Sequence, residues 1–241
     1  MNLVVDFGNT FIKMALFKGS DILRQITYSN VDQIIDDKKN YQDAQNIIIG
    51  SVTDKHLLFI DSLSNHKKIL LLESLTSTPL KNLYENATTL GTDRIAASVG
   101  AFSLYPNQNV LTIDAGTCIK YNFVNKNNEF IGGAISPGIE MRLKAMNHFT
   151  SKLPLFAFDL NYEKLTGTNT QESILSGALV GTAAELESII EKYINTYENL
   201  KVVITGGDAG YLCKQLKNRF FARPNIVLYG LNTILNFNIE K

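Results

Sequence analysis

The chain has 241 residues, of which 45% are hydrophobic and 19% charged, a mixture that excludes a disordered chain and allows one large domain or two small ones. Lysine plus arginine and aspartate plus glutamate number 23 each, so the charge gives no reason to expect binding to nucleic acid or to an anionic membrane. Two cysteines are few for a secreted fold that depends on disulfides, which favours reduced thiols in the cytosol.

The first 30 residues are typical of strands rather than of a targeting segment. The apolar run Leu3–Val5 is broken at Asp6 and has no basic segment before it, which argues against a signal peptide. Two further apolar runs, Phe11–Phe17 and Ile22–Tyr28, flank a turn signal and predict two more strands. No stretch approaches the roughly 20 apolar residues of a membrane span. We therefore expect a soluble, cytoplasmic protein with no membrane segment.

A helix is predicted from Thr92 to about Tyr105, with Thr92 as its N-cap. Its start, Gly91-Thr92-Asp93-Arg94, places an acid and a base in the first turn. An ordinary helix start explains Thr92 and Asp93, but not Arg94, because a cation is disfavoured at that end. Arg94 should have an anionic partner, either Asp93 or a bound carboxylate or phosphate.

The middle of the chain repeats the pattern of its beginning. The segment Asp6-Phe7-Gly8-Asn9-Thr10-Phe11-Ile12-Lys13 aligns with Asp114-Ala115-Gly116-Thr117-Cys118-Ile119-Lys120 when one residue is dropped. The flanks agree as well, because Val110–Ile113, Cys118–Val124 and Phe130–Ser136 also predict strands. The repeat indicates a duplicated β-meander.

The C-terminal half adds mostly helices. They are predicted at Ile139–Phe149 and from Thr170 to about Tyr197, and the glycines of the second, Gly177 and Gly181, are expected to pack closely against a strand or a ligand. A late strand, Lys201–Thr205, leads through two glycines into a short helix. We predict an α/β protein with two similar lobes, residues 1–108 and 109–241, and a central cleft.

Each Asp-x-Gly turn has the parts of a phosphate-binding loop. Glycine lets backbone N–H groups approach a ligand closely, and such groups, with the side chains of Asn9 and Thr10, can hold phosphate oxygens. Asp6 at the strand end can reach Mg²⁺, and Lys13 adds positive charge. The alternative is a plain hairpin with an Asx-type turn, but two copies with matching flanks favour two phosphate loops. The sequence has no G-x-x-x-x-G-K-[ST] and no G-x-G-x-x-G pattern.

Taken together, these motifs resemble those of the type III pantothenate kinases, the bacterial first enzymes of coenzyme A synthesis, over nearly the whole chain. The matching positions are Asp6–Lys13, Tyr84, Gly91–Arg94, Asp114–Thr117, Gly132–Gly138 with Leu153-Pro154, and Thr170, Ile174, Ser176 and Gly177. The sequence departs from the family at Cys118, where alanine is usual, and at Lys120, where threonine is common. Neither departure is expected to take part in the chemistry.

The resemblance implies a duplicated actin-like (ribonuclease H-like) ATPase fold of the hexokinase type, and phosphorylation of pantothenate to 4′-phosphopantothenate with ATP. The implied nucleotide-binding positions are Asp6, Phe7, Gly8, Asn9, Thr10, Phe11, Ile12, Lys13 and Thr117. The implied substrate-binding positions are Tyr84, Gly91, Thr92, Asp93, Arg94 and Thr170, with Asp93 as general base. Asp114 would bind a monovalent cation, K⁺ or NH₄⁺, and Asp6 would bind Mg²⁺. The family forms homodimers.

Two other functions remain open from the sequence. One is a kinase of the same fold that acts on another small alcohol or acid, which only a substrate panel would separate. The other is a non-catalytic regulatory accessory protein. Such a regulator could lose Asp93 or the Asp6 loop without harm, yet both are intact, and no DNA-reading motif is apparent.

Overall fold

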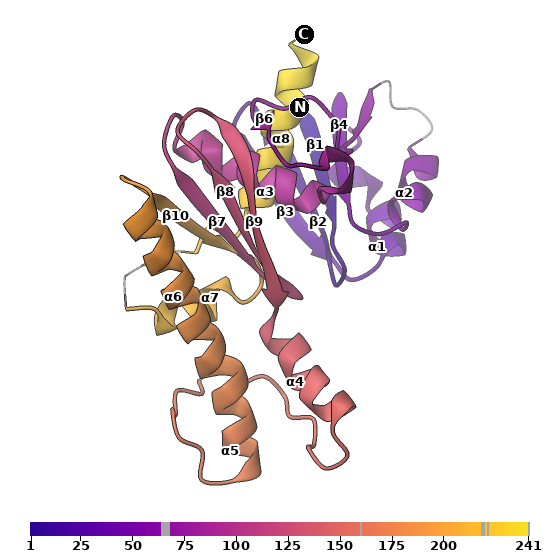
Figure 1. Ribbon diagram of the computed structural model, residues 1–241. Coiled ribbons are helices and arrows are strands. Elements are labelled where there is room, and N and C mark those ends of the chain that lie inside the picture. The colour runs from indigo at the N-terminus through magenta and orange to yellow at the C-terminus, as the bar shows by residue number, and fades with distance from the viewer. Residues whose placement is uncertain (64–67, 160, 218–219, 221, 241) are drawn as a thin grey trace. The chain divides into compact units, whose positions relative to one another are not determined.

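The computed structural model describes residues 1–63, 68–159, 161–217, 220 and 222–240 (Figure 1). Its elements in chain order are β1 (Asn2–Phe7), β2 (Ile12–Lys18), β3 (Asp21–Tyr28), α1 (Val31–Asp36), η1 (Lys38–Asn40), β4 (Asn46–Ser51), α2 (His56–Ser62), β5 (Ile69–Leu71), β6 (Lys81–Asn82), η2 (Ala87–Thr89), α3 (Thr92–Leu104), β7 (Val110–Ala115), β8 (Cys118–Val124), β9 (Glu129–Pro137), α4 (Ile139–Phe149), α5 (Thr170–Leu175), η3 (Ser176–Val180), α6 (Gly181–Thr196), β10 (Lys201–Thr205), α7 (Ala209–Gln215) and α8 (Ile226–Ile239).

The predicted strands and helices are confirmed to within one or two residues at their ends. The sequence analysis did not predict β4 or α8. The apolar run Ile47–Ile49 was the available signal for β4, and all three residues are buried.

The chain forms two compact units that differ from the expected division into residues 1–108 and 109–241. Unit 1 contains Met1–Asn107, Val124–Gly132 and Asn225–Lys241, and unit 2 contains Gln108–Phe123 and Gly133–Pro224. The C-terminal helix α8 therefore belongs with the N-terminal residues. The reason is its packing: α8 contacts α3, β1 and β4.

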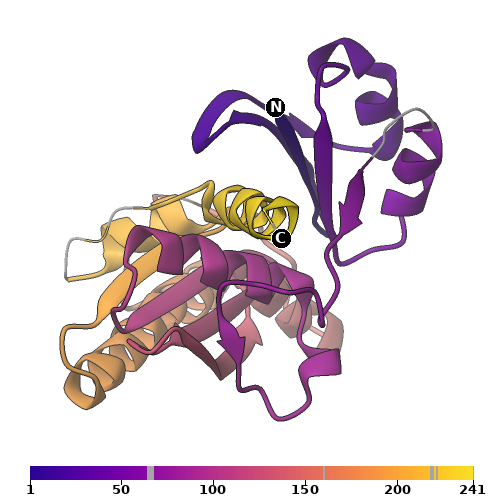
Figure 2. The same cartoon turned by 90° about the horizontal axis from the view of Figure 1, so that it is seen from above.

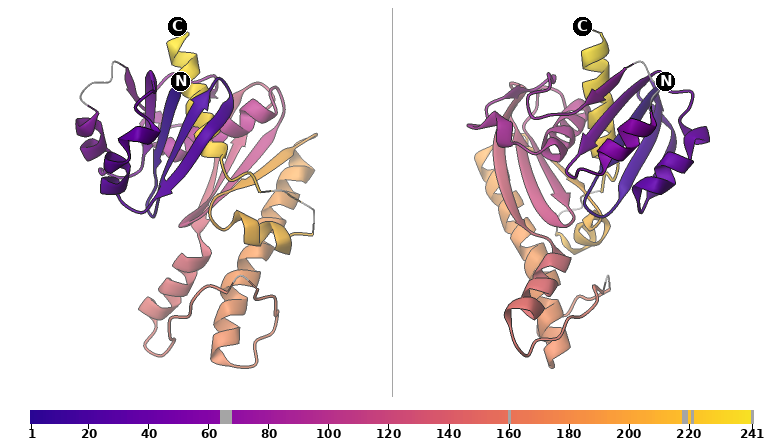
Figure 3. Two further views of the ribbon diagram at one scale, coloured as in Figure 1. Left: turned by 180° about the vertical axis from the view of Figure 1, so that it is seen from behind. Right: turned by 90° about the vertical axis from the view of Figure 1, so that its right-hand side faces the viewer.

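Unit 1 is built on a mixed sheet with strand order β3-β2-β1-β4-β5. β1 pairs with β2 in an antiparallel hairpin and with β4 in parallel. Because side chains alternate across a strand, β1 buries Leu3 and Val5 on one face and Val4 on the other. Figures 2 and 3 show α1 and α2 over the first face and α8 over the second. Both faces of the sheet are thus covered, which fixes the strand ends that carry the first loop.

The helices α3 and α8 approach each other through glycine. A Cβ atom added at Gly230 of α8 would lie 1.8 Å from the carbonyl oxygen of Ala96, and one added at Gly100 of α3 would lie 2.1 Å from that of Ile226. Only glycine permits this spacing of the two backbones. The position of α3, and with it Gly91–Arg94, depends on this contact.

Unit 2 is built on the strand order β10-β7-β8-β9. β10 runs parallel to β7, with Thr205 opposite Asp114. The short strand β6 pairs with the start of β9, Lys81 opposite Glu129, and these residues belong to unit 1. In the core of unit 2, one face of β7 and β8 packs against α4, α6 and α7. The hairpin β7–β8 of unit 2 therefore has the same form as β1–β2 of unit 1, which confirms the predicted repeat.

The run Thr170–Thr196 forms α5, one π-helical turn and α6 (Figure 1). This run is long and apolar enough to cross a membrane, by length and composition alone, which contradicts the expectation that no stretch approaches the length of a membrane span. Its residues Leu175, Leu179 and Leu186 lie in the core of unit 2. The expected close packing of Gly177 and Gly181 against a strand was wrong: among the described residues, a Cβ atom at either position would meet nothing within 4 Å. Packing of these glycines against a ligand stays a prediction.

Candidate active site

The first predicted loop is the turn of the β1–β2 hairpin in unit 1. The strands pair so that Asp6 lies opposite Lys13. Gly8 N–H donates to the carbonyl oxygen of Phe11 at 3.1 Å and closes the turn. The strand end thus presents a carboxylate and an ammonium side by side, both half-buried. This pair is suited to phosphate and to the metal ion that accompanies it.

The side chains of this loop differ in their exposure. The side chains of Phe7 and Ile12 are buried in the core under α1 and α2, so they anchor the hairpin. Asn9, Thr10 and Phe11 are exposed. The exposed turn and the half-buried Asp6 and Lys13 are therefore the parts of the loop that are open to a ligand.

The start of α3 is fixed to the same edge of the sheet as the first loop. The predicted N-cap at Thr92 was wrong: Gly91 is the N-cap, without a side-chain hydrogen bond, and Thr92 is the first helical residue. The Thr92 hydroxyl donates instead to the carbonyl oxygen of Ser51 at 2.9 Å. Ser51 ends β4 and lies opposite Phe7 of β1. The hydroxyl therefore holds the first turn of α3 beside the strand end that leads into the first loop.

The carboxylate of Asp93 is held close to the backbone of this turn. Its Oδ1 atom accepts the backbone N–H of Arg94 at 2.8 Å. A Cβ atom added at Gly91 would lie 2.6 Å from the same oxygen, so a side chain there would push the carboxylate out of this position. The carboxylate is half-buried and has a defined position, as a general base requires.

Arg94 lies in an aromatic setting that the sequence did not reveal. Its side chain is buried, with the guanidinium carbon 5.4 Å from the ring centre of Tyr84 and 5.7 Å from that of Phe130. Both distances are within the range of cation–π attraction. A Cβ atom added at Gly132, which has φ +133, would lie 3.6 Å from the Tyr84 ring. The structure thus brings Tyr84, Arg94 and Phe130 together, while the binding of substrate by Tyr84 and Arg94 stays a prediction.

A separate cavity of about 290 Å³ in unit 1 adjoins α3. Leu90, Ile95, Ser98 and Phe130 are among its lining residues, together with the hydroxyl-rich segment 74–78. None of the predicted substrate positions lines it.

The second predicted loop is the turn of the β7–β8 hairpin in unit 2. Gly116 N–H donates to the carbonyl oxygen of Cys118 at 3.1 Å, which makes this turn one residue shorter than the first. Gly138 N–H donates to the carbonyl oxygen of Thr117, also at 3.1 Å. A Cβ atom added at Gly138 would lie 2.0 Å from the carbonyl oxygen of Gly116. The Pro137-Gly138 turn therefore packs directly on the loop, while the Thr117 side chain stays exposed.

Asp114 of this loop forms an ion pair with Lys120. The Lys120 Nζ atom lies 2.7 Å from Asp114 Oδ2, and the two side chains are only 20% and 15% exposed. A pair so sheltered from water is screened much less than a surface pair.

The glycines after β10 lie beside the second loop. The backbone N–H of Asp208 donates to the carbonyl oxygen of Ala115 at 3.0 Å. Gly206 has φ +97, and a Cβ atom there would lie 2.1 Å from the same oxygen. Burial, and then the charge of Glu140, raises the pKa of the Asp208 carboxyl to about 6. The carboxyl ends of β7 and β10 thus form one glycine-rich edge, suited to close approach by a nucleotide.

A polar cluster behind the Pro137-Gly138 turn was missed by the sequence analysis. The Glu185 carboxylate accepts hydrogen bonds from Tyr121 and Ser136, at 3.0 and 2.6 Å, and pairs with Arg142. The Arg142 Nε–H also donates to the carbonyl oxygen of Pro137 at 2.9 Å. Burial would raise the pKa of Glu185, but the hydrogen bonds of Ser136, Arg142 and Tyr121 outweigh it and lower the pKa. The residues come from β8, β9, α4 and α6, so no local sequence signal could have found the cluster.

Thr170 is the first residue of α5 and is exposed. The N-cap is its neighbour Asn169, whose side chain accepts the backbone N–H of Glu172 at 2.9 Å. Thr170 belongs to unit 2, whereas Tyr84 and Gly91–Arg94 belong to unit 1. Its assignment to the substrate stays a prediction.

Comparison with known proteins gives consistent matches. The profile of the family described as type III pantothenate kinase matches residues 2–192. A type III pantothenate kinase of Christiangramia forsetii is 42% identical over 241 residues, covering 99% of each chain.

Two solved structures resemble the chain in fold. A conserved Baf family transcriptional activator from Campylobacter jejuni matches with a TM-score of 0.65 and 21% identity, covering 99% of this chain and 100% of that one. The activator of the 2-hydroxyisocaproyl-CoA dehydratase from Clostridium difficile, solved with ADPNP, matches with a TM-score of 0.59 and 14% identity over 99% and 95% of the chains. The structural neighbours have actin-like ATPase and sugar-kinase folds, so the predicted fold class is confirmed.

Proposed function

The chain belongs to the type III pantothenate kinase family, and from that membership we propose that it transfers the terminal phosphoryl group of ATP to the hydroxyl of pantothenate. The product, 4′-phosphopantothenate, is the first intermediate of coenzyme A synthesis. The single observation that carries the proposal is the whole-chain match at 42% identity. The presence of Asp93, whose carboxylate accepts the backbone N–H of Arg94 at the start of α3, agrees with the proposal.

ATP is proposed to contact both hairpin turns. In unit 1 the exposed turn of Asn9, Thr10 and Phe11 would approach the phosphates, and in unit 2 Thr117 would do so. The open backbone at Gly207 would accommodate the ribose or the base, since among the described residues a Cβ atom there would meet nothing within 4 Å. Phosphoryl transfer depends mainly on positioning and on neutralised charge, and each loop would contribute to both.

Pantothenate is proposed to lie against the start of α3. Arg94, with Tyr84 beside it, would bind the carboxylate end of the substrate, and the exposed Thr170 hydroxyl would contribute a hydrogen bond. Gly91 and Thr92 would line the pocket near the reacting hydroxyl. A site with one arginine and several hydroxyl groups matches a molecule that carries a carboxylate at one end and a hydroxyl at the other.

Asp93 is proposed as the general base. Its carboxylate takes the proton of the substrate hydroxyl as that oxygen bonds to the γ-phosphorus of ATP. The bond between the γ-phosphorus and the β–γ bridging oxygen breaks, and ADP leaves with the electron pair. The backbone N–H of Arg94 donates to Oδ1 and helps to keep the carboxylate oriented.

The donor set at Asp6 fits a divalent cation. A half-buried carboxylate at a strand end, next to an exposed phosphate loop, provides the oxygen ligand that Mg²⁺ prefers. Bound with ATP, Mg²⁺ would neutralise phosphate charge. At Asp114 the resemblance implies K⁺ or NH₄⁺, whereas in this chain a lysine ammonium already contacts that carboxylate.

The protein is further proposed to act in the cytoplasm as a homodimer, with pantothenate rather than nucleic acid or membrane as its partner. Unit 2 supports the dimer, because it exposes large apolar side chains on β9, on α4 and between α4 and α5. They are Ile135, Phe149, Leu155 and Leu165.

A substrate panel tests the proposed function. Purified protein with ATP and Mg²⁺ should release ADP when pantothenate is added, and should release little with other small hydroxy acids, pantetheine or simple sugars. Turnover of another small alcohol while pantothenate is inert would contradict the assignment and leave the fold intact. No turnover of any alcohol would favour the regulatory alternative.

A further inference from the structure

The ion pair between Lys120 and Asp114 places a positive charge at the second loop. Lys120 Nζ lies 2.7 Å from Asp114 Oδ2, and both side chains are largely sheltered from water. Lys120 is on β8 and Asp114 is near the end of β7, and the Gly116-Thr117 turn joins these two adjacent strands. The position of the Lys120 ammonium is therefore set by the paired strands of the hairpin and not by a flexible loop.

The same arrangement occurs in the first hairpin. Lys13 on β2 lies opposite Asp6 on β1. The shorter second turn brings Lys120 to the corresponding place relative to Asp114, as the aligned sequence motifs require. Each hairpin of the repeat thus carries one lysine and one aspartate at the base of its turn.

A lysine ammonium is a compact monovalent cation that forms hydrogen bonds with carboxylate oxygens. A K⁺ or NH₄⁺ ion at Asp114 Oδ2 would have to displace Lys120 or remain close to a like charge in a sheltered place, where Coulomb repulsion is strong. The residues present therefore do not fit a monovalent cation at this carboxylate. A threonine at position 120 would leave the carboxylate without that ammonium.

We propose that Lys120 is the built-in monovalent cation of the second phosphate loop, so that the enzyme needs neither K⁺ nor NH₄⁺. This inference rests on the proposed kinase function for its catalytic readout. Lys120 acts as a positioning residue: it neutralises Asp114 and so lets the adjoining Thr117 and backbone N–H groups hold phosphate without an added ion. Two variants and one measurement that needs no turnover separate this role from a purely structural one.

The first experiment measures pantothenate phosphorylation after dialysis into tetramethylammonium buffer, with KCl or NH₄Cl replacing tetramethylammonium chloride at constant ionic strength. The parent should change less than about twofold. Lys120→Thr should lose on the order of tenfold or more in kcat/KM for ATP without K⁺, and K⁺ or NH₄⁺ should restore most of the loss. Lys144→Thr, which changes an exposed lysine of α4, is the matched control and should behave like the parent.

The second experiment needs no turnover, so it remains decisive if pantothenate proves not to be the substrate. Thermal melting with Mg²⁺·ADP is recorded in KCl and in tetramethylammonium chloride. We expect K⁺ to raise the melting temperature of Lys120→Thr and to leave that of the parent unchanged. Activation or stabilisation of the parent by K⁺ would overturn the proposal, and this readout decides even if the variant does not fold. A variant that keeps full activity without K⁺ would overturn it as well.

Discussion

At the scale of single residues, the site depends on a few side chains whose positions are set by backbone contacts. Asp93 is fixed by the N–H of Arg94 and by the missing Cβ atom of Gly91. Thr92, expected to cap α3, instead joins it to the end of β4. The start of the helix is therefore organised around the carboxylate, and the ordinary capping role is left to a glycine.

Replacing the proposed base should remove catalysis and leave the fold intact. In Asp93→Asn the amide keeps the shape of the side chain but cannot take the hydroxyl proton. We expect kcat to fall by a factor on the order of 10²–10⁴, with an unchanged melting temperature. The measurement is steady-state kinetics with saturating ATP and pantothenate. Asp61→Asn on α2, an exposed carboxylate, is the control, and near-parental turnover of Asp93→Asn would reduce Asp93 to a structural role.

Asp208 gives a pH-dependent stability with a defined sign. Its pKa is raised from 3.8 to about 6 by burial and by Glu140, so the folded protein holds this proton more tightly than the unfolded chain. Its contribution to the free energy of unfolding is therefore present below about pH 4 and is lost as the pH rises through about 6.

Asp208→Asn should melt at a higher temperature than the parent at pH 8, and this advantage should shrink towards pH 5. Thermal melts of the ligand-free protein at several pH values measure it, with Asp43→Asn, at an exposed position, as control. A difference that is the same at every pH would show that Asp208 does not titrate in this range.

At the scale of elements, the position of α3 depends on its close crossing with α8. Gly100 and Gly230 allow two backbones to approach within distances that no side chain permits. The helix that carries Asp93 is thus held by the last helix of the chain, which the sequence analysis did not predict.

A methyl group at this crossing should destabilise unit 1. Gly230→Ala would place Cβ 1.8 Å from the carbonyl oxygen of Ala96, so the helices must move apart. We expect the free energy of unfolding to fall by about 1–3 kcal/mol or more, measured by urea denaturation. Gly210→Ala in α7 is the matched control, because among the described residues its Cβ atom would meet nothing within 4 Å. It should gain about 0.5–1 kcal/mol from helix propensity, and equal effects of the two changes would contradict the packing argument.

The sequence predicted those elements whose signals are local. Apolar runs separated by Asp-x-Gly turns specify both hairpins, and their repetition made the duplication visible. Contacts between distant segments were not predictable in this way. Phe130 joins Tyr84 and Arg94 only through the pairing of β6 with β9, and Glu185 meets Arg142 only in the folded unit. Lys120 was noted as a departure without a role, because only the hairpin register brings it to Asp114.

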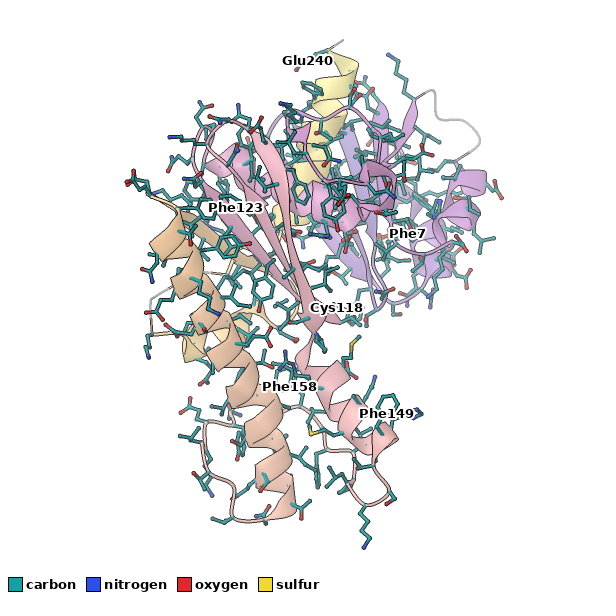
Figure 4. The ribbon with its side chains drawn as sticks, viewed as in Figure 1. Phe7, Cys118, Phe123, Phe149, Phe158 and Glu240 are labelled. Carbon is teal, nitrogen blue, oxygen red and sulfur yellow. The ribbon has the colours of Figure 1, made fainter. Side chains whose placement is uncertain are left out.

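At the scale of the whole molecule, the expected assembly is a homodimer. Phe149, labelled in Figure 4, ends α4. Its side chain is 81% exposed. Leu155 and Leu165 on the segment that follows are also exposed. Several exposed large apolar side chains between residues 149 and 165 are therefore the reason to test this part of the chain for a protein–protein contact.

A charge at this surface should weaken the dimer. Phe149→Asp is expected to shift the protein towards monomer in size-exclusion chromatography with light scattering. Leu57→Asp on α2, which also changes an exposed apolar residue, is the control and should stay dimeric. A parent protein that is monomeric at micromolar concentration would contradict the homodimer.

The most direct test of the central claim is the identity of the product. Purified protein is incubated with pantothenate, Mg²⁺ and ATP labelled with ¹⁸O in the γ-phosphoryl group, and the products are analysed by mass spectrometry. The account predicts labelled 4′-phosphopantothenate and unlabelled ADP in equal amounts. The Asp93→Asn variant should form neither product on the same time scale. ADP formed without phosphopantothenate, or label recovered only in inorganic phosphate, would contradict it.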